Sequence, residues 1–126
     1  MSYEYYNSNP NNRRASDCVI RAISKVMNKA WEAVYMELTS KGMEYHDMPN
    51  SPNVIEKYLV MQGFEKKMLR NICPECTTVA EFAEDHSHGR YVLITEGHAV
   101  AVINGTYYDT WDSGDEVVIY YFEEVM

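Results

Sequence analysis

The sequence lacks the features that mark membrane and secreted proteins. It has no run of about 18 apolar residues, the length that a membrane-spanning helix needs. No basic start followed by an apolar stretch is present, so we expect no secretory signal. Only three cysteines occur among 126 residues. This odd number is too small for a disulfide framework and favours a reducing, cytoplasmic location.

Positive charge is also scarce. The chain has 11 Lys and Arg against 19 Asp and Glu, which gives a formal charge of −8. Because binding a phosphate backbone requires a basic face, we expect no nucleic-acid partner, and we expect no membrane partner either. The chain is 46% hydrophobic and 13% aromatic, which excludes a disordered polymer. Its length suits one domain over residues 1–126.

The chain begins with a polar, asparagine-rich segment, which predicts an extended arm over residues 1–14. Apolar residues at helical spacing and capping residues then predict helices that begin near Ser16, Trp31, Ser51 and Thr78. From Arg90 the pattern changes to strands over residues 91–94, 98–103, 106–111 and 117–122. The order predicts an α+β fold, with N-terminal helices followed by a small C-terminal antiparallel sheet.

Cys18 is the first candidate for chemistry because it lies in the first turn of a predicted helix. Free backbone N–H groups and the helix dipole lower the pKa of a thiol at that place. The neighbouring Asp17 opposes this effect, so an imidazolium nearby would also have to stabilise the thiolate. Without such a partner, Cys18 would be only a small buried residue.

His98 is the candidate partner, and the predicted hairpin supplies an aspartate for it. Asn104 and Gly105 form the strongest short signal for a two-residue turn. This turn places His98 on one face with Trp111 and, diagonally, with Asp109. A three-residue turn would instead place Asp112 opposite His98. Either aspartate could orient the imidazole, and we favour Asp109.

Two stretches of the chain, NRRASDCVIRA (residues 12–22) and GHAVAVINGTYYDTWDSG (residues 97–114), carry a resemblance to a known family. They resemble papain-like cysteine peptidases of bacteria and their phages, and most of all the small bacteriocin-processing domains. The resemblance implies a papain-like fold with the nucleophile at the start of the first helix and its partners on the sheet. It also implies the cytoplasm of a bacterium, or of the host cell of a phage.

The resemblance further implies a role for each matching residue. Cys18 would be the nucleophile, His98 the base and Asp109 the residue that orients His98. Asn12, six positions before Cys18, would donate to the oxyanion together with the backbone N–H of Cys18. These roles describe a thiol-dependent hydrolase, a cysteine protease or related amidohydrolase, that acts on a peptide or protein substrate without a cofactor or metal.

Three other interpretations remain open. Cys73 and Cys76, followed by His86 and His88, could bind zinc, although the histidines are closer together than in zinc fingers. A chain with 11 tyrosines could instead be a non-catalytic binding or inhibitor protein on the same scaffold. The same triad could also transfer its acyl group to an amine, as a transglutaminase does, or act as a deamidase. The sequence does not indicate the oligomeric state.

Overall fold

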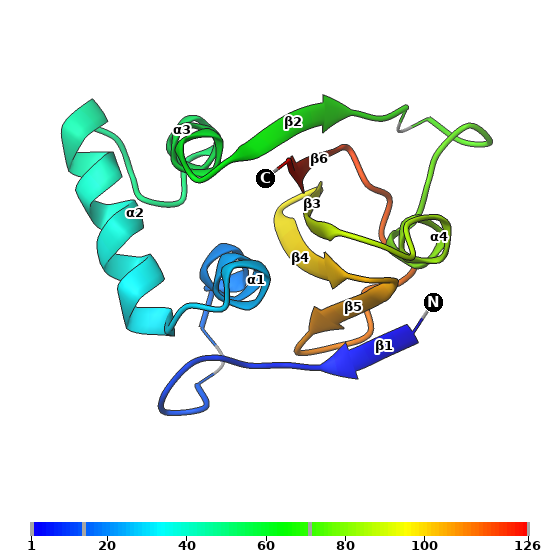
Figure 1. Ribbon diagram of the computed structural model, residues 1–126, viewed down its shortest axis with the longest axis horizontal. Helices are drawn as coiled ribbons and strands as arrows, with labels where there is room; N and C mark the ends of the chain where they lie inside the picture. The colour runs from blue at the N-terminus through cyan, green and yellow to red at the C-terminus, as the bar shows by residue number, and fades with distance from the viewer. Residues whose placement is uncertain (1, 14, 71, 126) are drawn as a thin grey trace.

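A mixed β-sheet forms the middle of the molecule, and helices pack against both of its faces (Figure 1). The computed structural model describes residues 2–13, 15–70 and 72–125, and these residues form four helices and six strands. In chain order the elements are β1 (Ser2–Tyr5), α1 (Cys18–Met27), α2 (Trp31–Tyr45), α3 (Pro52–Met61), β2 (Phe64–Met68), α4 (Val79–Asp85), β3 (Arg90–Thr95), β4 (His98–Ile103), β5 (Thr106–Asp109) and β6 (Tyr120–Glu124).

The sheet corrects the fold predicted from the sequence. Its strand order is β1-β5-β4-β3-β6-β2, and β1 runs parallel to β5 while the other pairs are antiparallel. One strand precedes the first helix and another lies between α3 and α4. The predicted papain-like order, helices followed by a small C-terminal antiparallel sheet, is therefore wrong, because helices and strands are interspersed.

The two missed strands are the edges of the sheet, and their sequences explain why no pattern revealed them. Three of the four side chains of β1 are exposed, and β2 buries only Phe64. Edge strands are held mainly by backbone hydrogen bonds and commonly carry charged side chains, so they need no apolar alternation. Part of the predicted extended arm is thus β1, while Met1 and Arg14 lie outside the described residues.

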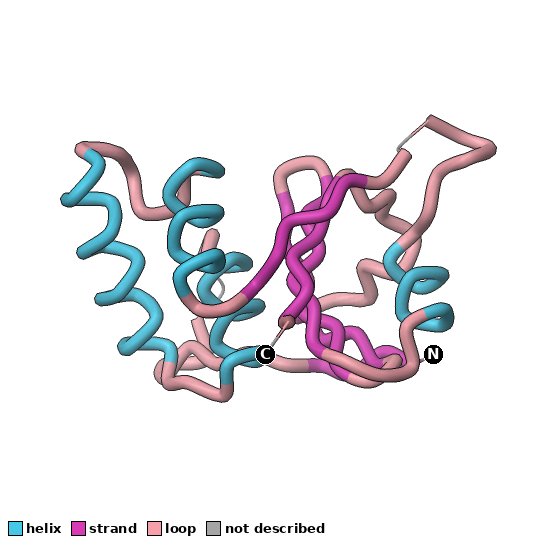
Figure 2. Tube along the Cα trace, turned by 45° about the horizontal axis from the view of Figure 1, so that its top comes forward, coloured by secondary structure: helices cyan, strands magenta, loops and turns pink. Residues whose placement is uncertain are grey.

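The middle strands are buried on both faces. Val92, Ala99 and Ala101 pack in one core with α1, α2 and α3, whereas Leu93 and Val100 pack in a second core with α4. Figure 2 shows these two layers, with α1, α2 and α3 on one side of the strands and α4 on the other. The continuous apolar runs of β3 and β4 are the composition that such a doubly covered strand requires.

Capping residues in the sequence correctly predicted where α3 and α4 begin. Ser51 caps α3 by accepting a hydrogen bond from the backbone N–H of Val54 at 3.2 Å, and Thr78 with Glu81 forms the predicted capping box of α4. The helix α2 begins at the predicted Trp31 and ends at Tyr45. Among the described residues, none of the helices has the length and apolar character needed to cross a membrane.

Candidate active site

The backbone places Cys18 as the first residue of α1, with Asp17 at the N-cap position. The Asp17 side chain makes no capping hydrogen bond. It accepts a hydrogen bond from Nε1 of Trp31 at 2.9 Å and pairs with the guanidinium of Arg21. The backbone N–H of Cys18 is among the first four of the helix, which have no partner inside the helix and carry the positive end of its dipole.

The β4–β5 hairpin brings His98 to Asp109. Asn104 and Gly105 have positive φ values of 48° and 84°, as a two-residue hairpin turn requires. Ile103 pairs with Thr106 and Ala101 with Tyr108, which confirms the predicted register.

This register places Nε2 of His98 2.6 Å from Oδ2 of Asp109. The ring of Trp111 lies beside the imidazole, with 5.2 Å between the ring centroids. Asp112 does not reach His98, because its Oδ1 accepts hydrogen bonds from the Tyr107 hydroxyl and the Gly114 backbone N–H. The structure therefore selects Asp109 over Asp112 as the neighbour of the imidazole.

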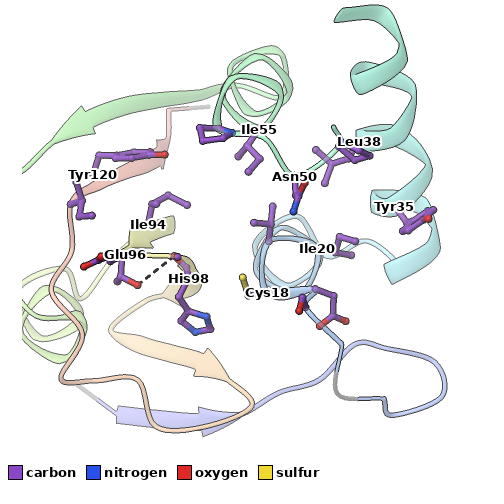
Figure 3. Close-up of a pocket in the computed structure, with 18 residues that line it drawn as sticks. Cys18, Ile20, Tyr35, Leu38, Asn50, Ile55, Ile94, Glu96, His98 and Tyr120 are labelled. Atoms are coloured by element: carbon purple, nitrogen blue, oxygen red, sulfur yellow. Dashed lines mark hydrogen bonds between the residues drawn. The ribbon is translucent and has the colours of Figure 1, made fainter. Parts of the chain in front are cut away.

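Cys18 and His98 lie side by side and perturb each other (Figure 3). Burial alone raises the pKa of the thiol, but the hydrogen bond and charge of His98, a backbone hydrogen bond from Ala99 and the charge of Arg21 bring the pKa below its ordinary value. Burial lowers the pKa of His98, but hydrogen bonds with Asp109 and Cys18 outweigh it and raise this pKa to about 9. Both shifts favour a thiolate beside an imidazolium.

The Asp109 carboxylate is almost completely buried, at 3% exposure, and each oxygen has two partners. Oδ2 accepts hydrogen bonds from His98 and, at 2.6 Å, from the hydroxyl of Ser113. Oδ1 accepts from the backbone N–H of Thr110 at 2.8 Å and from Arg21 at 3.3 Å. Burial raises the pKa of Asp109, but the bonds to His98 and Ser113 together bring it below its ordinary value.

A cavity of about 530 Å³ opens beside the Cys18 sulfur, between the start of α1, α3, the segment before α3 and the β3–β4 turn (Figure 3). Its wall includes Cys18 and His98, and two acidic residues also line it, the buried Asp17 and the exposed Glu96. Most of the rest of the wall is apolar: Val19, Ile20, Tyr35, Leu38, Pro49, Pro52, Ile55, Ile94, Ile119 and Tyr120. A ligand of mainly apolar surface would therefore fit next to the thiol.

The structure does not bring Asn12 to this cavity. Asn12 is exposed, has a positive φ of 52° and is absent from the cavity wall. Its side-chain oxygen accepts a hydrogen bond from Asn7 at 3.4 Å. Of the four residues suggested by the sequence, Cys18, His98 and Asp109 thus meet, and Asn12 lies apart from them.

The second cluster suggested by the sequence is not arranged for a metal. Cys73 and Cys76 are joined by a disulfide, so they do not present two thiolates. Nδ1 of His86 lies 2.8 Å from the backbone oxygen of Phe82, and His88 is exposed. Over the ranges 2–13, 15–70 and 72–125, no group of three or more His, Cys, Asp or Glu residues could hold a metal ion.

Two residues of the site were missed from the sequence, Arg21 and Ser113. Both are buried, at 7% and 0% exposure. The ion pair of Arg21 could have been predicted, because a long cation in an otherwise apolar helix needs an acidic partner. Asp17 lies one helical turn before it. No feature of the sequence marks Ser113 as a residue of the site, since serine is common in turns.

Comparison with known proteins finds no family model, no curated protein and no solved structure that matches this chain. The site must therefore be interpreted from its own geometry.

Proposed function

We propose that this protein is a thiol-dependent hydrolase that cleaves an amide through a thioester on Cys18. The observation that supports this proposal is the position of His98, which contacts Asp109 through one ring nitrogen and interacts with Cys18 beside an open cavity. A nucleophile, a base and a group that orients the base are what covalent acyl transfer requires. A buried structural cysteine needs none of these neighbours.

In the first half of the reaction, the Cys18 thiolate attacks the carbonyl carbon and forms a C–S bond. The tetrahedral intermediate collapses as the C–N bond breaks, and the His98 imidazolium gives its proton to the leaving amine. In the second half, His98 takes a proton from water, and the resulting hydroxide attacks the thioester. The C–S bond then breaks, the carboxylic acid leaves and Cys18 returns as a thiolate paired with protonated His98.

The backbone N–H of Cys18 is the donor that we assign to the oxyanion. It lies at the helix N-terminus, next to the carbon that the thiolate attacks, and N–H groups of this kind stabilise developing negative charge. The family resemblance implies the same role for Asn12, but the contacts of Asn12 give no support for this assignment. We therefore propose a mechanism that does not use its side chain.

The cavity indicates which acyl groups would bind. Its apolar wall favours a bulky aliphatic or aromatic group, with about 25 cal/mol gained per Å² of apolar surface buried. Glu96 at the rim, together with the formal charge of −8, disfavours an anionic substrate. The substrate that we propose is accordingly a peptide or other amide with a bulky apolar group on its acyl side and no negative charge there.

A library of peptides that differ only in the residue on the acyl side of the cleaved bond tests this proposal. The expected result is cleavage after large apolar residues and none after Asp or Glu, with cleavage abolished in Cys18→Ala. A thiol-directed acyl electrophile should label the natural protein and not Cys18→Ala, while both show the same circular dichroism. Equal labelling of the two proteins, or no turnover of any library member, would refute a hydrolase that acts through Cys18.

The products also identify the acyl acceptor. With water as the acceptor the acyl product is a free carboxylic acid, and the leaving group is an amine from a peptide bond or ammonia from a side-chain amide. With an added amine as the acceptor the acyl product is a transamidated amide. We propose water, and mass spectra of the products distinguish these three outcomes. We also propose the cytoplasm as the location, because a reducing compartment keeps the Cys18 thiol free. The disulfide between Cys73 and Cys76 argues for an oxidising compartment instead, and cell fractionation decides between the two.

A further inference from the structure

A continuous series of buried and half-buried polar side chains runs from α2 through α1 to the candidate triad. Nε1 of Trp31 donates to Oδ2 of Asp17 at 2.9 Å, and Oδ1 of Asp17 accepts from NH1 of Arg21. NH2 of Arg21 then donates to Oδ1 of Asp109 at 3.3 Å. The other oxygen of Asp109 lies 2.6 Å from Nε2 of His98. Arg21 is thus the link between the helix that carries Cys18 and the strand that carries Asp109.

The charges along this series of hydrogen-bonded side chains alternate. Asp17 and Asp109 carry one negative charge each and Arg21 carries one positive charge, so the three fixed groups leave a single negative charge. A protonated His98 balances it, and the Cys18 thiolate beside His98 then gives the whole network one net negative charge. Without Arg21, two carboxylates with exposures of 5% and 3% would lie close to each other with no cation between them. Like charges in such a place force one carboxyl to take up a proton or to move.

Stability alone does not account for this arrangement. Removing an Asp and an Arg from water costs several kcal/mol for each ion, and apolar replacements of similar volume often leave a fold equally stable or more stable. Apart from the uncharged Ser24, the other buried residues of α1 are apolar, such as Ile23 and Val26. The ion pair is found only in the part of α1 that faces Asp109 and Cys18, which is where a fixed charge affects the chemistry.

We infer that Arg21, held in place by Asp17, is a positioning residue that keeps the Asp109 carboxylate ionised and directed at His98. The inference rests on the proposed function, because it assigns Arg21 a part in activating the Cys18 thiol. Arg21 acts through Asp109, at the carboxylate oxygen opposite the one that contacts the imidazole, and its charge also lowers the pKa of Cys18 directly. Asp17 and Trp31 act one step further away, by fixing the guanidinium.

Four variants test the inference. Arg21→Met removes the charge and keeps most of the volume. Asp17→Asn combined with Arg21→Met removes both partners of the ion pair and so avoids an unpaired buried Asp17. Arg21→Lys keeps a positive charge without the fork that reaches two carboxylates. Arg90→Met is the matched control, because Arg90 is a half-buried arginine that donates to the backbone oxygen of Val26 at 2.9 Å.

The readouts are the pH midpoint of Cys18 alkylation and the separate values of kcat and KM on the cleaved peptide. We expect Arg21→Met and the double variant to raise the midpoint by about one pH unit and to lower kcat about tenfold or more, with KM within twofold. Arg21→Lys should recover part of both losses. Arg90→Met should match the natural protein in both readouts.

The outcomes separate this inference from the proposed function. If the natural protein has the midpoint of an ordinary free cysteine and cleaves nothing, the proposed function fails. If the natural protein is active but folded Arg21→Met keeps its midpoint and kcat, Arg21 has only a structural role and the inference is wrong. Should Arg21→Met not fold, Arg21→Lys decides alone: an unchanged midpoint and kcat would overturn the inference, and a raised midpoint with a lower kcat would support it.

Discussion

Nε2 of His98 lies 2.6 Å from Oδ2 of Asp109, and this contact leaves Nδ1 as the ring nitrogen that can face Cys18. The two residues are eleven positions apart and come together only because a two-residue turn sets the register of β4 and β5. The aspartate therefore fixes both the orientation and the charge of the imidazole, and through them the state of the thiol.

Replacing Asp109 by Asn should remove this control. The amide keeps the shape of the side chain but no longer stabilises the imidazolium, so we expect the pKa of His98 to fall from about 9. The loss of a correctly protonated base should lower kcat by about 10²–10⁴-fold. Asp112→Asn is the matched control, since Asp112 contacts Tyr107 and Gly114 rather than His98. Steady-state kinetics on both variants check this, and equal losses would argue against a special role for Asp109.

The pH dependence of alkylation should follow from the two pKa shifts. The pKa of Cys18 is lowered, so its thiolate persists at a pH where an ordinary cysteine is protonated. As the pH falls through this lowered pKa, the rate of reaction with iodoacetamide should fall. Above about pH 9 His98 loses its proton, so kcat for amide cleavage should decline there while the thiolate persists. A single alkylation midpoint at the value of a free thiol would contradict the assigned ion pair.

The parts of the fold that local chemistry determines could be predicted from the sequence. Caps at Ser51 and Thr78 located two helices, and the positive φ values that Asn104 and Gly105 tolerate fixed the hairpin. The approach of His98 to Asp109 followed from this register. These predictions succeeded because each depends on residues that are close in the sequence.

The parts that depend on distant pairing could not be predicted. β1 pairs with β5 across a separation of about a hundred residues, as Tyr3 with Tyr107 illustrates, and neither edge strand has an apolar pattern. The contact of Arg21 with Asp109 was similarly hidden, because the two residues are 88 positions apart. Asn12 is a different case. The family resemblance gave it a role, but its side chain is exposed and accepts a hydrogen bond from Asn7.

Asn12→Ala should therefore leave catalysis nearly unchanged. The side chain is exposed and does not line the cavity, so we expect kcat/KM on the cleaved peptide to stay within about twofold. Loss of a true oxyanion donor costs about 10²–10³ in kcat. A drop of that size, with the fold intact, would show that Asn12 moves to the site when substrate binds. Asn11→Ala, an exposed neighbour, controls for effects on the loop as a whole.

Thr78→Ala should reduce stability without affecting the site. Thr78 accepts a hydrogen bond from the backbone N–H of Glu81 at 3.2 Å, and its own N–H donates to the Glu81 carboxylate at 2.9 Å. Loss of an N-cap side chain costs about 1 kcal/mol of unfolding free energy. Urea unfolding measures this loss, and Thr77→Ala, outside the capping box, should cost less. Because α4 covers the face of the sheet opposite α1, the alkylation midpoint of Cys18 should not move.

Gly42→Ala should shift the part of the cavity wall that Pro49 forms. Gly42 is buried in α2, and an added Cβ would lie 2.7 Å from the backbone oxygen of Asp47 and 3.3 Å from the backbone nitrogen of Pro49. Alanine favours a helix by about 1 kcal/mol over glycine. Here, however, the clash is with backbone, and relieving such overpacking costs about 1–3 kcal/mol. The backbone must move, and Pro49 is part of the cavity wall.

We therefore expect Gly42→Ala to lower the free energy of unfolding and to raise KM for an apolar substrate, with kcat little changed because the triad is not touched. Ser40→Ala, at an exposed position of the same helix, is the control that gains only helix propensity and should be slightly more stable. Urea unfolding and peptide kinetics on the two variants test this. If Gly42→Ala were as stable as Ser40→Ala and kept its KM, the wall formed by Pro49 would not contribute to binding, and the apolar cavity would lose its role in selecting the substrate.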